Sequence, residues 1–248
     1  MGLSLIIPCY NYENSVVANY DKLKKKINNI KENVEIIFID DGSTDNTYKK
    51  LKKLQKKNKT VKVLKNSINQ GKSFSLILGI KKSKYDKIVI YDCDLPYFNY
   101  FNKVIAALEK YSLVYINRKS KESNLKTKKI NFYQLMRFLI GRMMCLFINF
   151  SCLNLGIGDT QAGLKAFIKP KKFKKIKFKS KKFFFDAEIM IIFYLLNKKM
   201  KYIPVEYSIP KDSTIKIFEF KNFLYLYELL KVIIYYKLVS KKKYTTLV

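Results

Sequence analysis

The fold is decided by residues 34–45, which read VEIIFIDDGSTD. The first six residues are mostly apolar, as is typical of a parallel strand buried on both faces. A glycine turn follows at once, and Ser43 or Thr44 can cap the next helix. Ligands of open α/β sheets bind at the carboxyl ends of the strands, so a nucleotide would lie beside Asp40 and Asp41. The alternative is a capped turn with solvated acids.

Short apolar segments alternate with lysine-dotted helical segments on both sides of this stretch. This alternation predicts a mostly parallel α/β sheet with crossover helices. Strands are expected at Leu3–Ile7, Val34–Asp40, Val61–Leu64, Lys87–Asp92, Leu113–Asn117, Ala162–Ile168 and Tyr202–Tyr207. Helices are expected at Ser73–Ile80, Ile130–Phe150, Asp186–Leu196 and in the tail Phe218–Lys243, with a basic linker at 118–129.

A second acidic strand end, Asp92-Cys93-Asp94, follows the apolar segment Lys87–Tyr91. Alternate residues of an extended segment point the same way, so both carboxylates can converge on one cation. Such hard oxygen ligands suit Mg²⁺ or Mn²⁺, which would neutralise charge on a departing nucleotide diphosphate. A lone Asp-x-Asp is common, but its place at a strand end favours a metal site.

A third segment, Asn69-Gln70-Gly71-Lys72, precedes the helix-like Ser73–Ile80. The glycine would let the backbone approach a phosphate, and Lys72 and the helix N-terminus would supply positive charge. A simple turn before a helix explains the same residues equally well.

Composition sets limits on the class of protein. The 248 residues, 48% of them hydrophobic, fit a single α/β domain. The net charge of +31 favours an anionic partner. An AT-rich coding sequence would produce the same excess of lysine, so charge alone decides nothing.

The cysteines and apolar segments bear on location. Cys9, Cys93, Cys145 and Cys152 lack metal-type spacing and indicate buried thiols in a reducing compartment. The amino-terminal residues lack the features of a signal peptide, so we expect a cytoplasmic protein. The best candidate for a membrane span, Met143–Gly158, is shorter than the roughly 20 residues required.

Two sets of motifs resemble known glycosyltransferases. The first set resembles, in order and spacing, the nucleotide-binding half of glycosyltransferase family 2: Ser4–Asn11, Asp40–Asp45, Asn69–Lys72 and Asp92–Leu95. The second set resembles the polyprenyl-phosphate branch of that family, with a pattern similar to dolichyl-phosphate β-glucosyltransferases: Asp159–Phe167, Phe185–Glu188 and Ile203–Tyr207.

The resemblance implies a GT-A fold, in which helices flank a mostly parallel sheet. It also implies a metal-dependent, inverting hexosyltransferase using Mg²⁺ or Mn²⁺, a UDP- or GDP-linked sugar and a polyprenyl phosphate. Residues 1–212 would form the catalytic domain, with a donor half at 1–117 and an acceptor half at 118–212. Residues 213–248 would be an amphipathic tail near the membrane. The protein would lie peripherally on the anionic cytoplasmic face of the membrane.

The resemblance also implies roles for individual residues. The nucleotide sugar would contact Pro8, Tyr10, Asn11, Asp40, Asp41, Asn69, Gly71, Lys72 and Asp92. The metal would be held by Asp92 and Asp94. The acceptor phosphate would be bound by Arg118 and Arg142. The catalytic candidates are Asp94, Asp159, Gln161 and Asp186.

The acceptor determines what Asp186 would do. This residue falls where relatives with hydroxyl acceptors place their general base. A phosphate acceptor, with a second pKa near ~6, is already largely anionic at neutral pH, so the enzyme would mainly align it and screen charge repulsion. Two residues depart from the related patterns: Pro96 stands where mannose synthases carry glutamine, and Ala162 where β-glucosyltransferases usually carry cysteine.

Two alternatives stay open at this point. A family 2 enzyme that glycosylates a hydroxyl of a surface glycan or lipid-linked saccharide would use Asp186 as a true base. A basic nucleic-acid-binding protein is suggested only by the charge and by 37 Tyr and Phe residues. Its positive charge should cluster on one face, whereas these lysines are spread along the chain without a recognised nucleic-acid motif. We therefore expect no nucleic acid partner.

Overall fold

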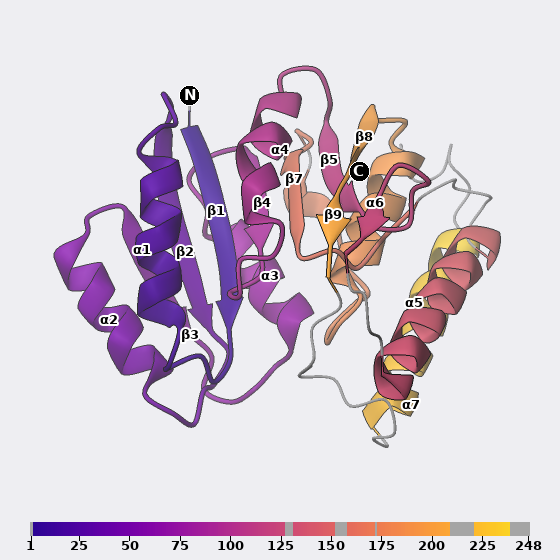
Figure 1. The fold of residues 1–248 in the computed structure, drawn as a ribbon, viewed down its shortest axis with the longest axis horizontal. Helices are drawn as coiled ribbons and strands as arrows, with labels where there is room; N and C mark the ends of the chain where they lie inside the picture. The colour runs from indigo at the N-terminus through magenta and orange to yellow at the C-terminus, as the bar shows by residue number, and fades with distance from the viewer. Residues whose placement is uncertain (1, 127–130, 152–157, 172, 209–220, 239–248) are drawn as a thin grey trace.

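The computed structural model describes residues 2–126, 131–151, 158–171, 173–208 and 221–238. Its centre is a seven-stranded sheet with the order β3-β2-β1-β4-β7-β5-β8 (Figure 1). The strands are β1 (Gly2–Cys9), β2 (Asn33–Asp40), β3 (Val61–Lys65), β4 (Lys87–Tyr91), β5 (Leu113–Asn117), β7 (Leu164–Ile168) and β8 (Met200–Pro204). Neighbouring strands pair in parallel except at β7, which is antiparallel to β4 and β5. The predicted α/β class with a mostly parallel sheet is confirmed.

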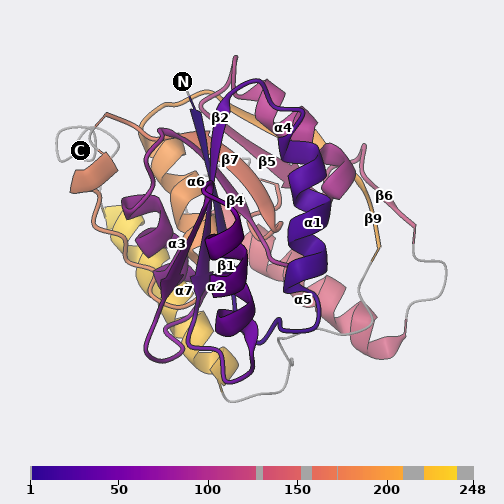
Figure 2. The same ribbon diagram turned by 90° about the vertical axis from the view of Figure 1, so that its left-hand side faces the viewer.

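Helices cover both faces of the sheet (Figure 2). The helices α1 (Val16–Ile27), α2 (Thr47–Lys57) and α4 (Phe101–Ala107) share one hydrophobic core, and α3 (Lys72–Lys81), α6 (Phe185–Leu195) and α7 (Lys221–Leu238) share the other. Short 3₁₀ turns occur at Phe98–Tyr100 and Phe173–Lys175. Strand β1 shows why two cores form, because its alternate residues point to opposite faces: Leu5 joins the first core and Ile6 the second.

The strand order creates a switch point between β1 and β4. From β1 the chain moves outward through β2 and β3, and it then returns to β4 on the other side of β1. Ligands of doubly wound sheets bind where the order reverses, outside the carboxyl ends of the strands. The loops after the two strands lie close together there, since Sγ of Cys9 is 3.2 Å from Sγ of Cys93. These two thiols are buried, as predicted, and so is Cys145, while Cys152 lies outside the described residues.

One predicted strand is wrong in its extent. The segment Tyr202–Tyr207 is divided into β8, which ends at Pro204, and β9 (Glu206–Tyr207). Proline lacks a backbone N–H and cannot continue donating to a ladder, which is consistent with a strand end. Strand β9 pairs instead with β6 (Asn124–Leu125) in a separate two-stranded sheet, so the predicted basic linker contains a strand.

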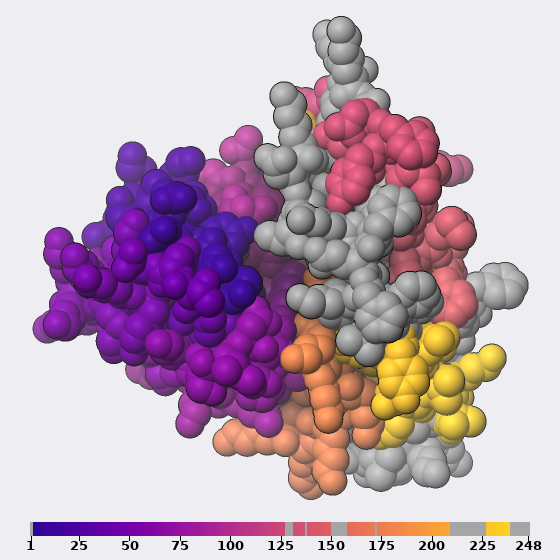
Figure 3. All heavy atoms as spheres, turned by 90° about the horizontal axis from the view of Figure 1, so that it is seen from below, coloured from indigo at the N-terminus to yellow at the C-terminus, as the bar shows by residue number. Residues whose placement is uncertain are grey.

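Helix α5 (Phe132–Ser151) and α7 lie side by side at one end of the molecule (Figure 1; Figure 3). Both predicted helices are thus confirmed within the described residues. Residues 130, 213–220 and 239–248, which belong to the predicted helices or tail, lie outside the described part of the chain. None of the described helices combines the length and apolarity needed to cross a bilayer.

Candidate active site

The loops after β1 and β2 are bound to each other at the carboxyl edge of the sheet. The backbone N–H of Asn11 donates to Oγ of Ser43 at 3.0 Å, and Oδ1 of Asn11 accepts the N–H of Thr44 at 2.9 Å. Asn11 has φ of 56°, a left-handed conformation that asparagine tolerates better than most residues. Nearby, Pro8 is half-buried and Tyr10 exposes its ring to solvent. These predicted nucleotide contacts therefore share one edge.

Asp40 ends β2 with a fully buried carboxylate. Neither of its oxygens has a hydrogen-bond partner. Burial raises its pKa above the ordinary aspartate value, and the nearby Ser43 offsets part of that rise without making a well-aligned hydrogen bond. A buried polar group without a partner is costly. A ligand N–H or hydroxyl at this position would remove that cost.

Asp41 is engaged by the chain itself. Its Oδ1 accepts hydrogen bonds from Nδ2 of Asn66 at 2.6 Å and from the N–H of Gln70 at 3.0 Å. Its Oδ2 accepts the N–H of Gly71 at 2.8 Å. Asp41 thus holds the loop that leads into α3, and Asn69 is exposed on that loop. Sequence reasoning missed Asn66, which no motif marked.

Gly71 sits where other residues do not fit. Its φ is +98°, a region that residues with a Cβ rarely adopt. A Cβ at this position would also lie 2.7 Å from the carbonyl oxygen of Lys182. The start of α3 is therefore packed directly against the segment around Lys182.

Asp92 and Asp94 follow β4 in different surroundings. The N–H of Asp92 donates to the carbonyl of Gly163 at 2.9 Å, and its Oδ1 lies 2.7 Å from Nζ of Lys72. Asp94 faces solvent. Desolvation by surrounding atoms and the negative charge of Asp92 raise the pKa of Asp94, although much of its side chain stays exposed. Pro96 lies against Gly163.

This pair of carboxylates fits a hard divalent cation. Mg²⁺ is commonly held by one or two carboxylates, with water and substrate phosphates completing its shell. The described residues contain no cluster of three or more Asp, Glu, His or Cys side chains able to hold a metal. Asp92 and Asp94 are the pair that would hold such a cation.

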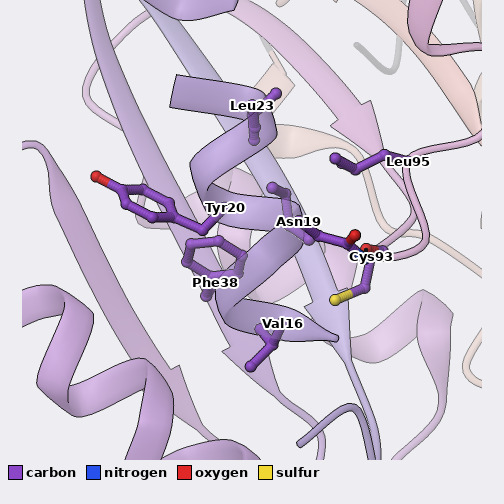
Figure 4. A pocket seen from close by; sticks show the side chains of 8 residues that line it. Val16, Asn19, Tyr20, Leu23, Phe38, Cys93 and Leu95 are labelled. Atoms are coloured by element: carbon purple, nitrogen blue, oxygen red, sulfur yellow. Dashed lines mark hydrogen bonds between the residues drawn. The ribbon is translucent and has the colours of Figure 1, made fainter. Parts of the chain in front are cut away.

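Helix α1 fixes the backbone that carries both aspartates (Figure 4). Nδ2 of Asn19 donates to the carbonyl of Cys93 at 2.8 Å. Cys93 and Leu95 are buried beneath the same helix, close to Val16 and Leu23. Leu95 adopts φ of 52°, so the turn after the acidic pair is left-handed. Such a conformation persists only where the surrounding structure holds it.

Asp186 is buried between two lysines. Its Oδ1 accepts from Nζ of Lys165 at 2.8 Å, and its Oδ2 lies 3.0 Å from Nζ of Lys72. Burial alone would raise the pKa of Asp186, but Lys165 and Lys72 lower it below the ordinary value. Burial would lower the pKa of Lys72, yet Asp186 and Asp92 raise it overall. Asp186 is thus a carboxylate held ionised.

Lys165 is a functional candidate that sequence reasoning missed. It is fully buried within β7, and it also donates to the carbonyl of Ala162 at 2.6 Å. Burial lowers its pKa, and Asp186 opposes that change. The available signal was a lysine inside the otherwise apolar segment Leu164–Ile168, because buried lysines are almost always paired.

Arg118 and Asp159 form a two-pronged ion pair. Nε of Arg118 donates to Oδ2 of Asp159, and Nη2 donates to Oδ1 at 2.9 Å. Burial would raise the pKa of Asp159, but Arg118 lowers it to about 2. The N–H of Gln161 also donates to Asp159 at 3.1 Å, whereas its side-chain Nε2 is buried without a partner. That amide group is available to a ligand.

Arg142 lies apart, exposed on α5, where its guanidinium stands 5.1 Å from the ring centre of Phe138. It still shares a neighbour with Arg118: burial raises the pKa of Tyr207, and both arginines act against that rise. Nζ of Lys119 donates to the carbonyl of Gly141 in α5 at 2.5 Å. The segment that carries Arg118 is therefore attached to α5.

Together these side chains form a series of alternating charge, which we call the charge row: Asp92, Lys72, Asp186, Lys165, Asp159 and Arg118. The first four are linked by ion pairs, and the last two pair with each other. Lys165 lies within electrostatic reach of Asp159 and so connects the two groups. The row leads from the predicted metal pair to the predicted acceptor arginine.

Comparisons with known proteins show which family the sequence belongs to. The sequence model described as glycosyl transferase family 2 matches residues 4–180. The dolichyl-phosphate beta-glucosyltransferase ALG5A of Trichomonas vaginalis is 27% identical over 225 residues, covering 87% of this chain and 68% of that protein. The uncharacterized glycosyltransferase sll0501 of Synechocystis sp. is 32% identical over 146 residues, covering 57% and 45%. The chain spans about half the length of the first curated relatives it matches.

A solved structure shares the fold. It is glucosyl-3-phosphoglycerate synthase from Mycobacterium tuberculosis, in complex with Mn²⁺ and uridine-diphosphate-glucose. The TM-score is 0.63 at 15% sequence identity, with 94% of this chain and 79% of that chain covered. This likeness confirms the GT-A architecture, and the family match confirms the motif resemblance. The chain belongs to glycosyl transferase family 2.

Proposed function

We propose that this protein is a metal-dependent, inverting hexosyltransferase that moves a sugar from a nucleotide diphosphate sugar to a membrane polyprenyl phosphate. The observation that carries the proposal is the position of the charge row, whose Arg118 end is attached to α5 through Lys119. Helix α5 presents apolar side chains to solvent. A lipid with a phosphate head and an apolar tail matches a cationic group beside an exposed apolar helix. The name of the Trichomonas relative supports the same acceptor class.

The exposed apolar side chains of α5 recur at helical spacing, and we call them the α5 stripe: Phe132, Leu135, Leu139, Ile140, Met143, Leu146 and Phe147. Helix α7 adds Tyr227, Leu230, Ile234 and Leu238. Exposed apolar faces of this kind, combined with basic side chains, suit a helix that lies in the interface of an anionic bilayer. We infer that α5 and α7 dock on the membrane surface, with Arg142 near the lipid headgroups.

The surroundings of Asp186 favour a phosphate acceptor over a hydroxyl. A general base needs a pKa near the working pH and access to the proton it removes. Asp186 is completely buried, has a lowered pKa and has both oxygens beside lysines. It is placed to orient Lys72 and Lys165. A phosphate acceptor needs no base, because it is already an anion.

Other residues would bind the donor and orient the acceptor. Asp40 and Tyr10 would bind the nucleoside, and Lys72 would contact the diphosphate beside Asp92. Mg²⁺ or Mn²⁺ bound at Asp92 and Asp94 would stabilise the departing diphosphate. The Nε2 group of Gln161 and the N–H groups of Arg118 that neither Asp159 nor Tyr97 uses would orient the acceptor phosphate behind the anomeric carbon. The rate enhancement would come from aligning the acceptor phosphate with the anomeric carbon and from screening the repulsion between that phosphate and the donor diphosphate.

A radiolabelled donor assay tests the proposal. Purified protein is incubated with Mn²⁺ or Mg²⁺, a panel of UDP- and GDP-sugars, and vesicles that contain polyprenyl phosphate. We expect label in an acid-labile lipid phosphate product. Label on a sugar hydroxyl, with none on the lipid phosphate, would show that the acceptor is wrong.

Flotation with liposomes tests the membrane surface. The variant Leu146→Glu should float several-fold less than wild type on anionic liposomes, since it places a charge in the α5 stripe. Its affinity for Mn²⁺ and nucleotide diphosphate should stay at the wild-type value. A matched control is Ile68→Glu, which changes another exposed apolar side chain far along the chain from α5. Equal flotation of all three proteins would contradict the docking surface.

A further inference from the structure

Helix α7 contacts the segment beside the start of α3 through the carboxylate of Glu228. Its Oε1 accepts a hydrogen bond from Oγ of Ser180 at 2.6 Å. The same oxygen accepts the N–H groups of Lys181 at 2.7 Å and Lys182 at 2.9 Å, with Phe183 more distant at 3.4 Å. Consecutive N–H groups that converge on one anion fix the local backbone. Glu228 thus holds segment 180–183, while Glu188 holds its beginning by accepting the N–H groups of Lys179 at 2.6 Å and Ser180 at 2.7 Å.

Segment 180–183 in turn holds the first turn of α3. The carbonyl of Lys182 accepts the N–H of Ser73 at 2.9 Å, and Oγ of Ser73 lies 2.7 Å from Oγ of Ser180. The absence of a side chain at Gly71 lets the two segments touch. Ser73 and Ser180 are both buried. The contacts flank Lys72 on either side in the sequence.

Lys72 is the residue that this support would place. Its ammonium group bridges Asp92 and Asp186 at 2.7 and 3.0 Å. A lysine side chain has many rotamers, so its position depends on where its backbone begins. Ser73 carries a second constraint, because its Oγ accepts the N–H of Phe185, the residue before Asp186. One small buried cluster therefore positions both Lys72 and its partner Asp186.

We propose that Glu228 is a positioning residue for the donor diphosphate, acting from α7 through segment 180–183 on Lys72. This inference rests on the proposed role of Lys72 in donor binding. It makes the membrane-facing helix a part of the donor site, although Glu228 touches no reacting atom. Losing the carboxylate should release the start of α3 and weaken the diphosphate contact.

Nucleotide affinity provides the main test. Titration calorimetry would measure binding of UDP and GDP with Mn²⁺, without lipid, to wild type, Glu228→Gln and Glu228→Ala. We expect about tenfold weaker binding of the preferred nucleotide for Glu228→Ala, and a smaller loss for Glu228→Gln, which keeps a neutral acceptor. Glu109→Ala, which removes an exposed glutamate of the α4 region, should bind as wild type does. Unchanged affinity in both Glu228 variants would overturn the proposal.

A double-mutant cycle distinguishes a role of Glu228 in positioning Lys72 from a general loss of packing around α7. If Glu228 acts through Lys72, Glu228→Gln should add almost nothing to the loss caused by Lys72→Ala. Val232→Ala loosens the packing of α7 in the core and leaves Glu228 in place. Additive losses in the cycle, or an equal loss in Val232→Ala, would mean that α7 acts only as general support. Glu228→Gln keeps the cycle measurable if Glu228→Ala does not fold.

Hydrogen exchange gives a readout that needs no ligand. In Glu228→Gln, amide exchange at Ser73 and at residues 181–183 should be at least about tenfold faster than in wild type, while β1 stays protected. Unchanged exchange at these amides would contradict the proposed path. Neither exchange nor nucleotide affinity involves the acceptor. A failed lipid-labelling assay would therefore overturn the acceptor proposal and leave this one standing.

Discussion

Two carboxylates of each half of the molecule differ in whether the chain itself supplies their partners. In residues 2–117, Asp40 has two buried oxygens without partners and Asp94 faces solvent. In residues 118–238, Asp159 and Asp186 are buried and already paired with cations. Asp40 and Asp94 lack partners that a ligand and a metal would bring, whereas Asp41 and Asp92 of the same half are already bound by the chain. Asp159 and Asp186 are neutralised before any ligand arrives.

This difference indicates how each half would bind its substrate. A nucleotide would gain from filling unsatisfied positions, since burial of Asp40 is costly without it. An acceptor phosphate would instead share cations that are already bound, such as Arg118, whose side chain keeps N–H groups beyond those used by Asp159. Weak, shared contacts suit an acceptor that is concentrated at a membrane surface. Lys72 joins the halves by contacting Asp92 and Asp186.

The largest expected effect is at Asp92. Asp92→Asn would remove one proposed metal ligand and weaken the contact with Lys72, and we expect kcat to fall by about 10²–10³-fold. Steady-state transfer assays at saturating Mn²⁺ check this value. Asp86→Asn, at an aspartate that is 78% exposed, is the control and should stay near wild type. A loss below about tenfold would place the metal elsewhere.

A substitution at Asp186 tests whether Asp186 and Lys165 neutralise each other inside the protein. Asp186→Asn leaves Lys165 buried without its counterion, so the free energy of unfolding should fall by about 3–5 kcal/mol. Adding Lys165→Met should recover much of that loss, which urea denaturation measures. At temperatures where the single variant is folded, kcat should fall less than the roughly 10²–10⁴-fold attributed to a lost general base. A larger loss would favour a hydroxyl acceptor.

Asp159 gives a smaller effect that depends on pH. Its folded pKa, about 2, lies below the ordinary value of 3.8, so its ionised form stabilises the fold. That contribution, about 2 kcal/mol, is present above about pH 4 and is lost as pH falls through about 2. Unfolding of wild type and Asp159→Asn should therefore differ at pH 7 and converge toward pH 2–3. A constant difference across this range would contradict the ion-pair origin.

Asp40 should show the smallest effect and the opposite sign. Its folded pKa is raised by burial, so ionisation costs stability as the pH rises above the ordinary value. Asp40→Asn should leave the protein as stable as wild type, or slightly more stable, at pH 7 and lose this advantage near pH 3. Its affinity for the nucleotide should be about tenfold weaker. Destabilisation at pH 7 with unchanged affinity would mean that Asp40 is structural.

The sequence predicted the first half more fully than the second, for a physical reason. Asp40 ends one apolar strand and Asp92 directly follows another. Because ligands of open α/β sheets bind at the carboxyl ends of the strands, the local pattern was sufficient to predict that both residues lie at one edge. The pairing of Arg118 with Asp159 joins residues 41 positions apart in sequence, and nothing local marks it. The antiparallel direction of β7 and the two-residue strands β6 and β9 also lack a periodic signal. Glu228 lies further still, in sequence, from Lys72, the residue that we propose it positions.

Gly163 has a consequence for exchanging parts between related enzymes. It belongs to the segment that enters β7, yet its carbonyl accepts the N–H of Asp92, and a Cβ there would overlap the Asp92 carboxylate. A chimera that joins residues 1–117 to the second half of a relative therefore keeps a working Asp92 only if the incoming part brings glycine to this position. The two parts of the chain cannot be recombined freely, because a glycine beyond residue 117 shapes the surroundings of Asp92.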